Sequence, residues 1–259
     1  GFGAPQSIFA LERHMNKVAQ AVGLSPDEFR RRNFLREGQS TAVGQVIREK
    51  VDLAGLMDRA FALSDYHAKL RQFSQTNPGS RIKRGIGFAS FLHGAGFTGS
   101  GEVMLASVAG VEATSEGRVR ILAASTEMGQ GTNTILSQIA ADTLGLAYEC
   151  VEVAQPDTAD VPNSGPTVAS RTVMIVGKLV ESAALALKQT LLASGLLPEG
   201  YDPAQFHQAA RRYVEKFGPL RCFSQYQPPP GIHWDEQKYE GDAYGAYAWA
   251  VYVAEVSVD

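Results

Sequence analysis

The stretch "STEMGQGTNTILSQIAADTLG", from Ser125 to Gly145, joins a β-like run to an amphipathic segment through a tight glycine turn. Residues 118–126 predict a strand, and the apolar positions after Gly131 recur at helical spacing. Glycines between a strand and a helix let the backbone come close to a ligand. The unpaired N–H groups and the dipole at a helix start favour an anion. We therefore expect residues 128–132 to form a ligand-binding turn.

A second helix start has similar chemistry. It follows the loop 156–166 and contains Gly165 and the run "TVASRT" from Thr167 to Thr172. Hydroxyl groups there could donate hydrogen bonds, and the carboxamide of Gln130 in the first turn could donate and accept. Because both helices follow strands, we expect the two starts to lie along the same edge of one sheet.

Spacing alone does not identify the ligand. The dinucleotide fingerprint G-x-G-x-x-G lacks its third glycine after Gly131, and Gly177-Lys178 lies within a predicted helix without the Ser or Thr of a P-loop. A helix start that is simply capped, with no ligand, remains open as an alternative. A nicotinamide-dependent dehydrogenase also remains open, on Gly129 and Gly131 alone.

The rest of the pattern predicts a mixed α and β fold, of the α+β class. We expect strands at 102–109, 118–126 and 148–155, a turn at 115–117, and a final strand at the C-terminal end. Helices are expected after the glycine turn, carrying apolar residues from Ile135 to Leu146, and at 167–194 and 203–216. A helix ending near Gly23 and one over 53–75 precede them. We therefore expect a helical segment at 1–80, which continues from a missing N-terminal part, and an α/β part at 81–259 that is incomplete at its C-terminus.

Composition excludes several classes of protein. The 259 residues carry a net charge of −3 with mixed signs, which gives no electrostatic case for nucleic acid or an anionic membrane. No apolar run reaches the ~20 residues of a membrane span. Two separated cysteines and five scattered histidines do not predict a disulfide framework or a protein-ligated metal site. The expectation is a cytoplasmic protein without a signal peptide.

Several motifs, taken in order, resemble one known family. The strings "GFGAPQ", "TEMGQGT" and "VPNSGPTVASRT", with "RRNFLREG", "KRGIG" and "AYAWAVYVAEVSVD", are similar to the molybdenum-cofactor subunit of the xanthine dehydrogenase/aldehyde oxidase family. The resemblance covers nearly the whole chain. It implies the cofactor-binding domain of a molybdenum hydroxylase, which hydroxylates an aromatic heterocycle or aldehyde with oxygen from water. Electrons would leave through 2Fe-2S clusters to FAD on partner subunits or domains.

The resemblance also implies site residues. Gln130, between Gly129 and Gly131, would hydrogen-bond a molybdenum-pterin cofactor, with or without a cytidine dinucleotide extension. Five residues of the second turn would contact the pterin and its phosphate: Thr167, Val168, Ala169, Ser170 and Thr172. The pterin would supply the sulfur ligands of molybdenum, so no protein atom need bind the metal.

For the substrate, the resemblance implies that Phe2 and Phe88 line the pocket. Ala89 stands where a threonine often follows in xanthine-oxidising relatives, which puts a purine substrate in doubt. The general base of the family has no match here and is expected beyond Asp259. Glu127 has a counterpart in the family without that role. A second hypothesis is that the isolated chain is a non-catalytic module for cofactor binding or assembly, completed by the rest of the molybdenum subunit.

Overall fold

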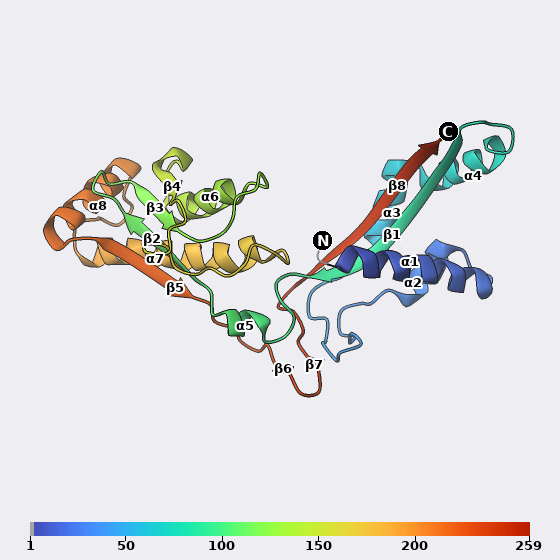
Figure 1. The fold of residues 1–259 in the computed structure, drawn as a ribbon, viewed down its shortest axis with the longest axis horizontal. Helices are drawn as coiled ribbons and strands as arrows, with labels where there is room; N and C mark the ends of the chain where they lie inside the picture. Colours follow the sequence, from blue (N-terminus) through green and yellow to red (C-terminus); the bar gives the residue numbers. More distant parts are fainter. Residues whose placement is uncertain (1–2) are drawn as a thin grey trace. The chain divides into compact units, whose positions relative to one another are not determined.

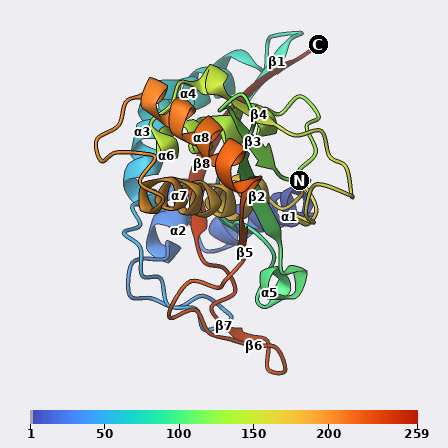
Figure 2. The same cartoon turned by 90° about the vertical axis from the view of Figure 1, so that its left-hand side faces the viewer.

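The computed structural model describes residues 3–259 and forms two compact units, whose helices and strands are labelled in Figures 1 and 2. Unit 1 contains the described residues up to Gly94 together with His233–Asp259, and unit 2 contains Ala95–Ile232. These units differ from the division at residue 80 expected from the sequence. The reason is strand pairing, because a strand that begins at Lys83 is completed by the C-terminal strand, 153 or more residues further along.

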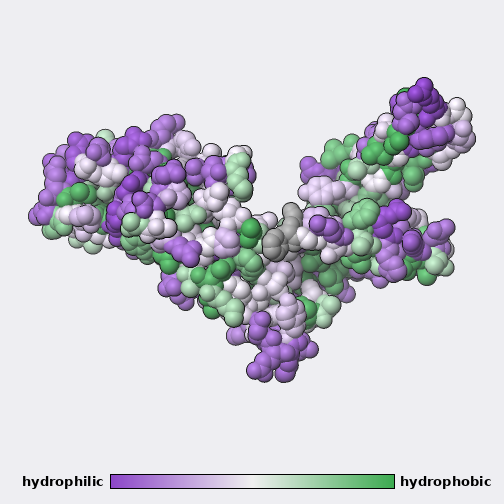
Figure 3. Space-filling view, viewed as in Figure 1, coloured by the Kyte–Doolittle hydropathy of each residue, from purple (hydrophilic) through white to green (hydrophobic). Residues whose placement is uncertain are grey.

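Unit 1 combines helices with a long antiparallel strand pair. Its elements are α1 Ala4–Ala21, α2 Pro26–Asn33, α3 Leu53–Ser64, α4 Tyr66–Thr76, β1 Lys83–Gly94, β6 Trp234–Asp235, β7 Glu240–Gly241 and β8 Tyr247–Val258. Strands β1 and β8 pair along their whole length, from Lys83 opposite Val258 to Gly94 opposite Tyr247. The short β6–β7 hairpin is hydrophilic, purple in Figure 3.

An aromatic cluster joins the helices of unit 1 to its sheet. Buried Met57, Phe61 and Tyr66 pack against Phe88 of β1 and Val253 of β8. The expected helix over 53–75 is instead two helices. Asp65 ends α3 and precedes α4 in the left-handed conformation, with φ 52°, and this kink is accompanied by stacking of the Phe61 and Tyr66 rings at 4.3 Å.

Unit 2 is a four-stranded mixed sheet with helices. Its elements are α5 Gly101–Leu105, β2 Val108–Ala113, β3 Val119–Leu122, α6 Thr132–Leu144, η1 Tyr148–Cys150, β4 Val151–Val153, the π-helix η2 Thr172–Gly177, α7 Lys178–Ala193, α8 Pro203–Phe217 and β5 Leu220–Gln225. The strand order is β4-β3-β2-β5, with β3 and β4 parallel and the other pairs antiparallel. The α+β prediction is therefore confirmed.

The core of unit 2 lies between this sheet and its helices. Alternate residues of β2 and β3, such as Val111 and Ile121, are fully buried against α7, whose Leu187 and Leu191 are also fully buried. In Figure 2, α7 and α8 lie over one face of the strands. Each leucine side chain removed from water contributes about 1.5–3 kcal/mol to folding, so the apolar periodicity of α7 fixes this face of the sheet.

The other face of the sheet carries charge. Glu112 of β2 stands directly opposite Arg120 of β3 and Arg221 of β5, and it forms ion pairs with both. Asp160, in the loop that leads to the second turn, also pairs with both arginines, at 3.0 Å and 2.7 Å. This ring of four charges ties the loop to the sheet.

Three segments of unit 2 differ from their predictions. Residues 102–109 do not form one strand, because α5 occupies 101–105 and the strand begins at Val108; the Glu102 side chain turns inward to a buried arginine and overrides the alternating pattern. Residues 148–150 form a 3₁₀ turn before the short β4. The helix expected from residue 167 begins at 171–172, since the two preceding residues are left-handed.

No helix among residues 3–259 has the length and apolar character needed to cross a bilayer.

Candidate functional site

The two turns singled out by the sequence line one cavity of about 380 Å³ in unit 2, a volume typical of small-molecule sites. The first turn and the start of α6 contribute Met128, Gln130, Gly131, Thr132 and Ile135; the second turn and the start of η2 contribute Thr167, Val168, Ala169, Ser170, Thr172 and Val173. All the predicted cofactor-binding residues except Gly129 line it. The expectation that the two helix starts lie together is confirmed.

Side-chain hydroxyls fasten the second turn to the carboxyl end of β3. The backbone N–H of Thr126 donates to Thr167 Oγ1 at 2.8 Å, which joins the two turns directly. The N–H of Ala124 donates to Ser164 Oγ at 3.0 Å, and that hydroxyl donates to the carbonyl of Val108 at 2.9 Å. The cavity therefore lies at the edge of the sheet, where the chain leaves β3.

Glu127 occupies the helix start that the sequence predicts for an external anion. Its carboxylate accepts the backbone N–H groups of Gly129 at 2.6 Å, Gly131 at 3.1 Å and Asn133 at 3.0 Å. The expectation that these donors are free for a ligand is therefore wrong. The hydrogen bonds from Asn133 and Gly131 lower the pKa of Glu127. An ionised carboxylate with its oxygens engaged is a poor general base near neutral pH, which agrees with a capping role.

The carboxamide of Gln130 braces the first turn from within. Its Oε1 accepts the N–H of Met128 at 2.6 Å, and its Nε2 donates to the carbonyl of Thr126 and to Thr132 Oγ1, each at 2.7 Å. Both N–H groups of the amide are used, while the oxygen retains acceptor capacity. The orientation of the amide is assigned from these partners. A hydrogen bond from Gln130 to a cofactor stays a prediction.

The second turn has an unusual backbone. Ala169 and Ser170 are consecutive residues in the left-handed region, with φ of 54° and 55°, which costs roughly 1–2 kcal/mol for each non-glycine residue. The helix that follows begins as the π-helix η2, a form often found at functional sites. The carbonyl of Ala169 accepts the N–H of Gly96 at 2.9 Å. Such a conformation persists only if surrounding groups hold it.

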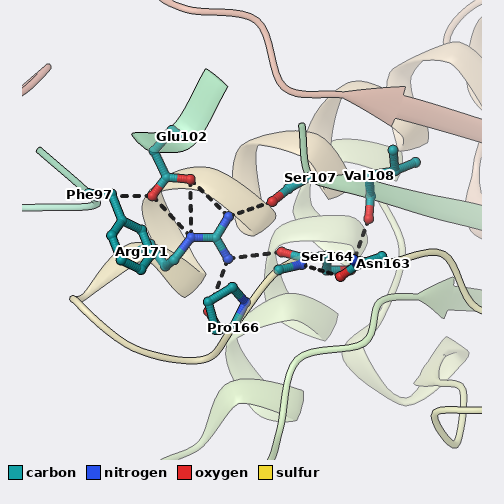
Figure 4. Close-up of polar contacts among 9 residues, drawn as sticks. Phe97, Glu102, Ser107, Val108, Asn163, Ser164, Pro166 and Arg171 are labelled. Carbon is teal, nitrogen blue, oxygen red and sulfur yellow. Dashed lines mark hydrogen bonds and ion pairs between the residues drawn. The ribbon is translucent and has the colours of Figure 1, made fainter. Parts of the chain in front are cut away.

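Arg171 supplies that support, and sequence reasoning did not find it. The side chain is fully buried and forms an ion pair with Glu102 at 2.9 Å. Figure 4 shows its guanidinium between Glu102, Ser107 and the carbonyl groups of Ser164 and Pro166. The only signal in the sequence was an arginine within a Ser/Thr-rich helix start and a glutamate within an apolar run.

Two of the predicted substrate residues, Phe88 and Ala89, do not line this cavity. Phe2 lies outside the described residues. Phe88 and Ala89 belong to β1 of unit 1, where they line a different cavity of about 420 Å³. The Phe88 ring packs edge-on against Phe61 at 5.0 Å, with the Arg30 guanidinium 5.0 Å from its centroid. Packing within unit 1 accounts for these contacts, so a substrate role stays a prediction.

No group of three or more His, Cys, Asp or Glu side chains within the described part of the chain is placed to hold a metal ion.

Known proteins match this chain along its length. A family model described as "Molybdopterin cofactor-binding domain" matches residues 59–259, and a second model with the same description matches residues 1–34. The chain is 32% identical over 194 residues to the xanthine dehydrogenase/oxidase of Gallus gallus, covering 74% of this chain and 14% of the relative. It is 29% identical over 262 residues to the aldehyde oxidoreductase of Megalodesulfovibrio gigas, covering 100% of this chain and 27% of the relative.

A solved structure agrees with these matches. The aldehyde oxidoreductase from Desulfovibrio gigas superposes with a TM-score of 0.77 at 26% identity, covering all of this chain and 27% of that one. The chain thus spans about a quarter or less of the length of these relatives. With the family model covering residues 59–259, the chain belongs to the family of molybdopterin cofactor-binding domains.

Proposed function

We propose that the cavity between the two turns holds the molybdenum-pterin cofactor of a molybdenum hydroxylase. The observation that carries the proposal is the convergence of Gln130 and Ser170, 40 positions apart, on the same cavity. One phosphorylated, ring-shaped ligand could touch both turns. The printed names of the relatives, a xanthine dehydrogenase and an aldehyde oxidoreductase, support an aromatic heterocycle or an aldehyde as substrate.

The donors around the cavity fit such a cofactor. The hydroxyls of Ser170 and Thr172 line it, and neither makes a hydrogen bond to another group in the described part of the chain. They stand at the start of a helix, where the first backbone N–H groups have no partner within the helix. These groups suit a phosphate, whereas the first turn is capped by its own Glu127. We therefore assign the phosphate to the second turn and the pterin to the first.

Apolar side chains complete the cavity. Met128, Ile135, Val168 and Val173 line it beside the polar groups. Apolar walls of this kind exclude water and pack against a flat ring, while a few polar groups fix its orientation. When bound, the cofactor supplies the oxidation of an electron-poor C–H carbon with oxygen from water. The chain itself binds and orients the cofactor through the residues named above.

The remaining parts of the enzyme are also part of the proposal. The rest of the molybdenum subunit supplies the general base, iron–sulfur and flavin partners accept the electrons, and Phe88 and Ala89 contribute to substrate choice. The cytoplasmic location rests on the two free cysteines, Cys150 and Cys222. The isolated chain is expected to bind or assemble the cofactor without turnover. The family match favours a pterin over the nicotinamide alternative.

Metal analysis of the full-length complex tests the proposal. The wild-type complex should contain molybdenum and iron, and Gln130→Ala should contain about tenfold less molybdenum, within the 10- to 100-fold range typical of residues that orient a metal site. Gln138→Ala is the matched control, because Gln138 is an exposed glutamine of α6 that does not line the cavity. It should keep full occupancy.

Two outcomes would contradict the proposal in different ways. A wild-type complex without molybdenum would overturn the function itself. Full molybdenum occupancy and turnover in Gln130→Ala would leave the function standing and remove Gln130 from the site.

A further inference from the structure

The guanidinium of Arg171 has all five of its N–H donors occupied in a buried site. Nε and one N–H of Nη2 bind the Glu102 carboxylate, at 2.9–3.1 Å. The other N–H of Nη2 donates to Ser107 Oγ at 2.6 Å. The two N–H groups of Nη1 donate to the carbonyls of Ser164 at 2.8 Å and Pro166 at 3.1 Å. We propose that Arg171 is a positioning residue, which fixes the second turn in the shape that holds the cofactor.

This inference rests on the proposed function and adds to it. Arg171 does not line the cavity, whereas its neighbours Ser170 and Thr172 do. Its bonds hold the carbonyls on either side of Gly165, just before the turn enters its left-handed residues. The arginine therefore acts on the cofactor through the backbone that presents those hydroxyls.

A second set of hydrogen bonds connects Glu102 to the turn. Glu102 Oε1 also accepts the N–H of Phe97 at 3.1 Å, which fixes the loop before α5. In that loop, the N–H of Gly96 donates to the carbonyl of Ala169. The path from Arg171 through Glu102 and this loop thus returns to the turn itself. Loss of the guanidinium would release the turn at both places.

The geometry needs an arginine. A guanidinium presents its five donors in a fixed plane, so it can bind a carboxylate, a hydroxyl and two carbonyls together. Lysine offers three donors from a single atom and could replace only part of the set. Arg171→Lys should therefore hold the cofactor less firmly than the wild type and more firmly than a variant with no cationic side chain at this position.

The chain offers a matched control in unit 1. Arg30 and Glu12 form another buried ion pair at 2.9 Å, with side-chain exposures of 4% and 11%, against 1% and 6% for Arg171 and Glu102. Arg30 does not line the cavity between the turns. Removing either arginine leaves a buried carboxylate unpaired, so both changes should lower stability. Only the change at Arg171 should also speed cofactor release while the protein is still folded.

The experiment compares Arg171→Met, Arg171→Lys and Arg30→Met in the intact molybdenum-containing complex. It measures the rate of pterin release in mild urea, the molybdenum content, the Mo(V) resonance spectrum, and the far-UV circular dichroism at each urea concentration. Arg171→Met should release pterin about 10- to 100-fold faster while the dichroism is unchanged, and its Mo(V) spectrum should broaden. Arg171→Lys should lie in between. Arg30→Met should release pterin only as it unfolds.

If Arg171→Met does not fold, Glu102→Gln and Ser107→Ala test the same network with smaller losses, and each should speed release before unfolding. The inference is overturned if release follows unfolding in every Arg171, Glu102 and Ser107 variant, as in Arg30→Met. In that case a loaded wild-type complex still supports the proposed function. A wild-type complex without pterin overturns both.

Discussion

The two turns of the cavity are stabilised in opposite ways. The first, residues 126–132, is held by its own side chains, since Glu127 and Gln130 bond only to groups within seven residues of themselves. The second, residues 164–172, is held by Arg171, which bonds to Glu102 and Ser107, 69 and 64 residues away from it along the chain. The first turn is solvent-exposed from Thr126 to Gln130, and the second rests on a buried ion pair.

The difference shows where each turn gets its rigidity. A local network forms as soon as its short segment takes shape, and it costs little entropy to close. A network between distant segments requires the sheet and α5 to be in place first. We therefore expect the second turn to be sensitive to changes in packing and the first to be sensitive mainly to its own side chains.

The largest expected effect comes from adding one methyl group to each turn. Gly165 has φ +75°, and a Cβ there would lie 2.8 Å from Ser107 Oγ and 2.9 Å from Arg171 Nη1. Gly131 has φ +90° and open space around the same position. Gly165→Ala should lower the free energy of unfolding by about 2–4 kcal/mol, because conformational strain and overpacking add. Gly131→Ala should cost about 1 kcal/mol, from strain alone.

Denaturant unfolding measures the free energy of unfolding of Gly165→Ala and of Gly131→Ala. Equal losses at the two glycines would show that the second turn can shift to accept a methyl group, and the contrast between a packed and an open turn would fail.

A smaller effect is expected where the turns meet. Thr167→Val removes the acceptor for the N–H of Thr126 and should cost about 1 kcal/mol of unfolding free energy. Thr167→Ser keeps the hydroxyl and should preserve the bond. Hydrogen exchange of the Thr126 amide should quicken in the valine variant only. Equal exchange in both variants would mean that the turns are joined by other contacts.

The smallest effect concerns Glu127 and depends on pH. Its pKa is lowered in the folded state by the N–H groups of Asn133 and Gly131, so the carboxylate stabilises the fold above its unfolded pKa. This contribution is lost as the pH falls through the lowered folded value. Thermal unfolding should therefore show Glu127→Gln to be less stable than wild type at pH 7, with a difference that shrinks below about pH 4.3. A difference that grows in acid would contradict the capping role.

The sequence predicts elements best where the signal is local. The helix after the glycine turn begins at Thr132 as expected, and it ends at Leu144, before the left-handed Gly145. The helix at Pro203 follows the capping residue Asp202 and also begins where the sequence predicts it. The strand predicted over 102–109 is wrong because the inward orientation of the Glu102 side chain depends on Arg171, which no local pattern reveals. The helix after the second turn begins later than expected because Ala169 and Ser170 are left-handed, and the buried bonds of Arg171 support that conformation.

By itself, the sequence determined the positions of the two helix starts, the mixed fold and the family, because glycine turns, caps and apolar periodicity act over a few residues. Only the tertiary structure decided that Glu127 fills the first helix start and that Arg171 holds the second turn. The physical reason is that a carboxylate or guanidinium takes its role from the partners that folding brings within hydrogen-bond distance. Sequence spacing does not contain those distances.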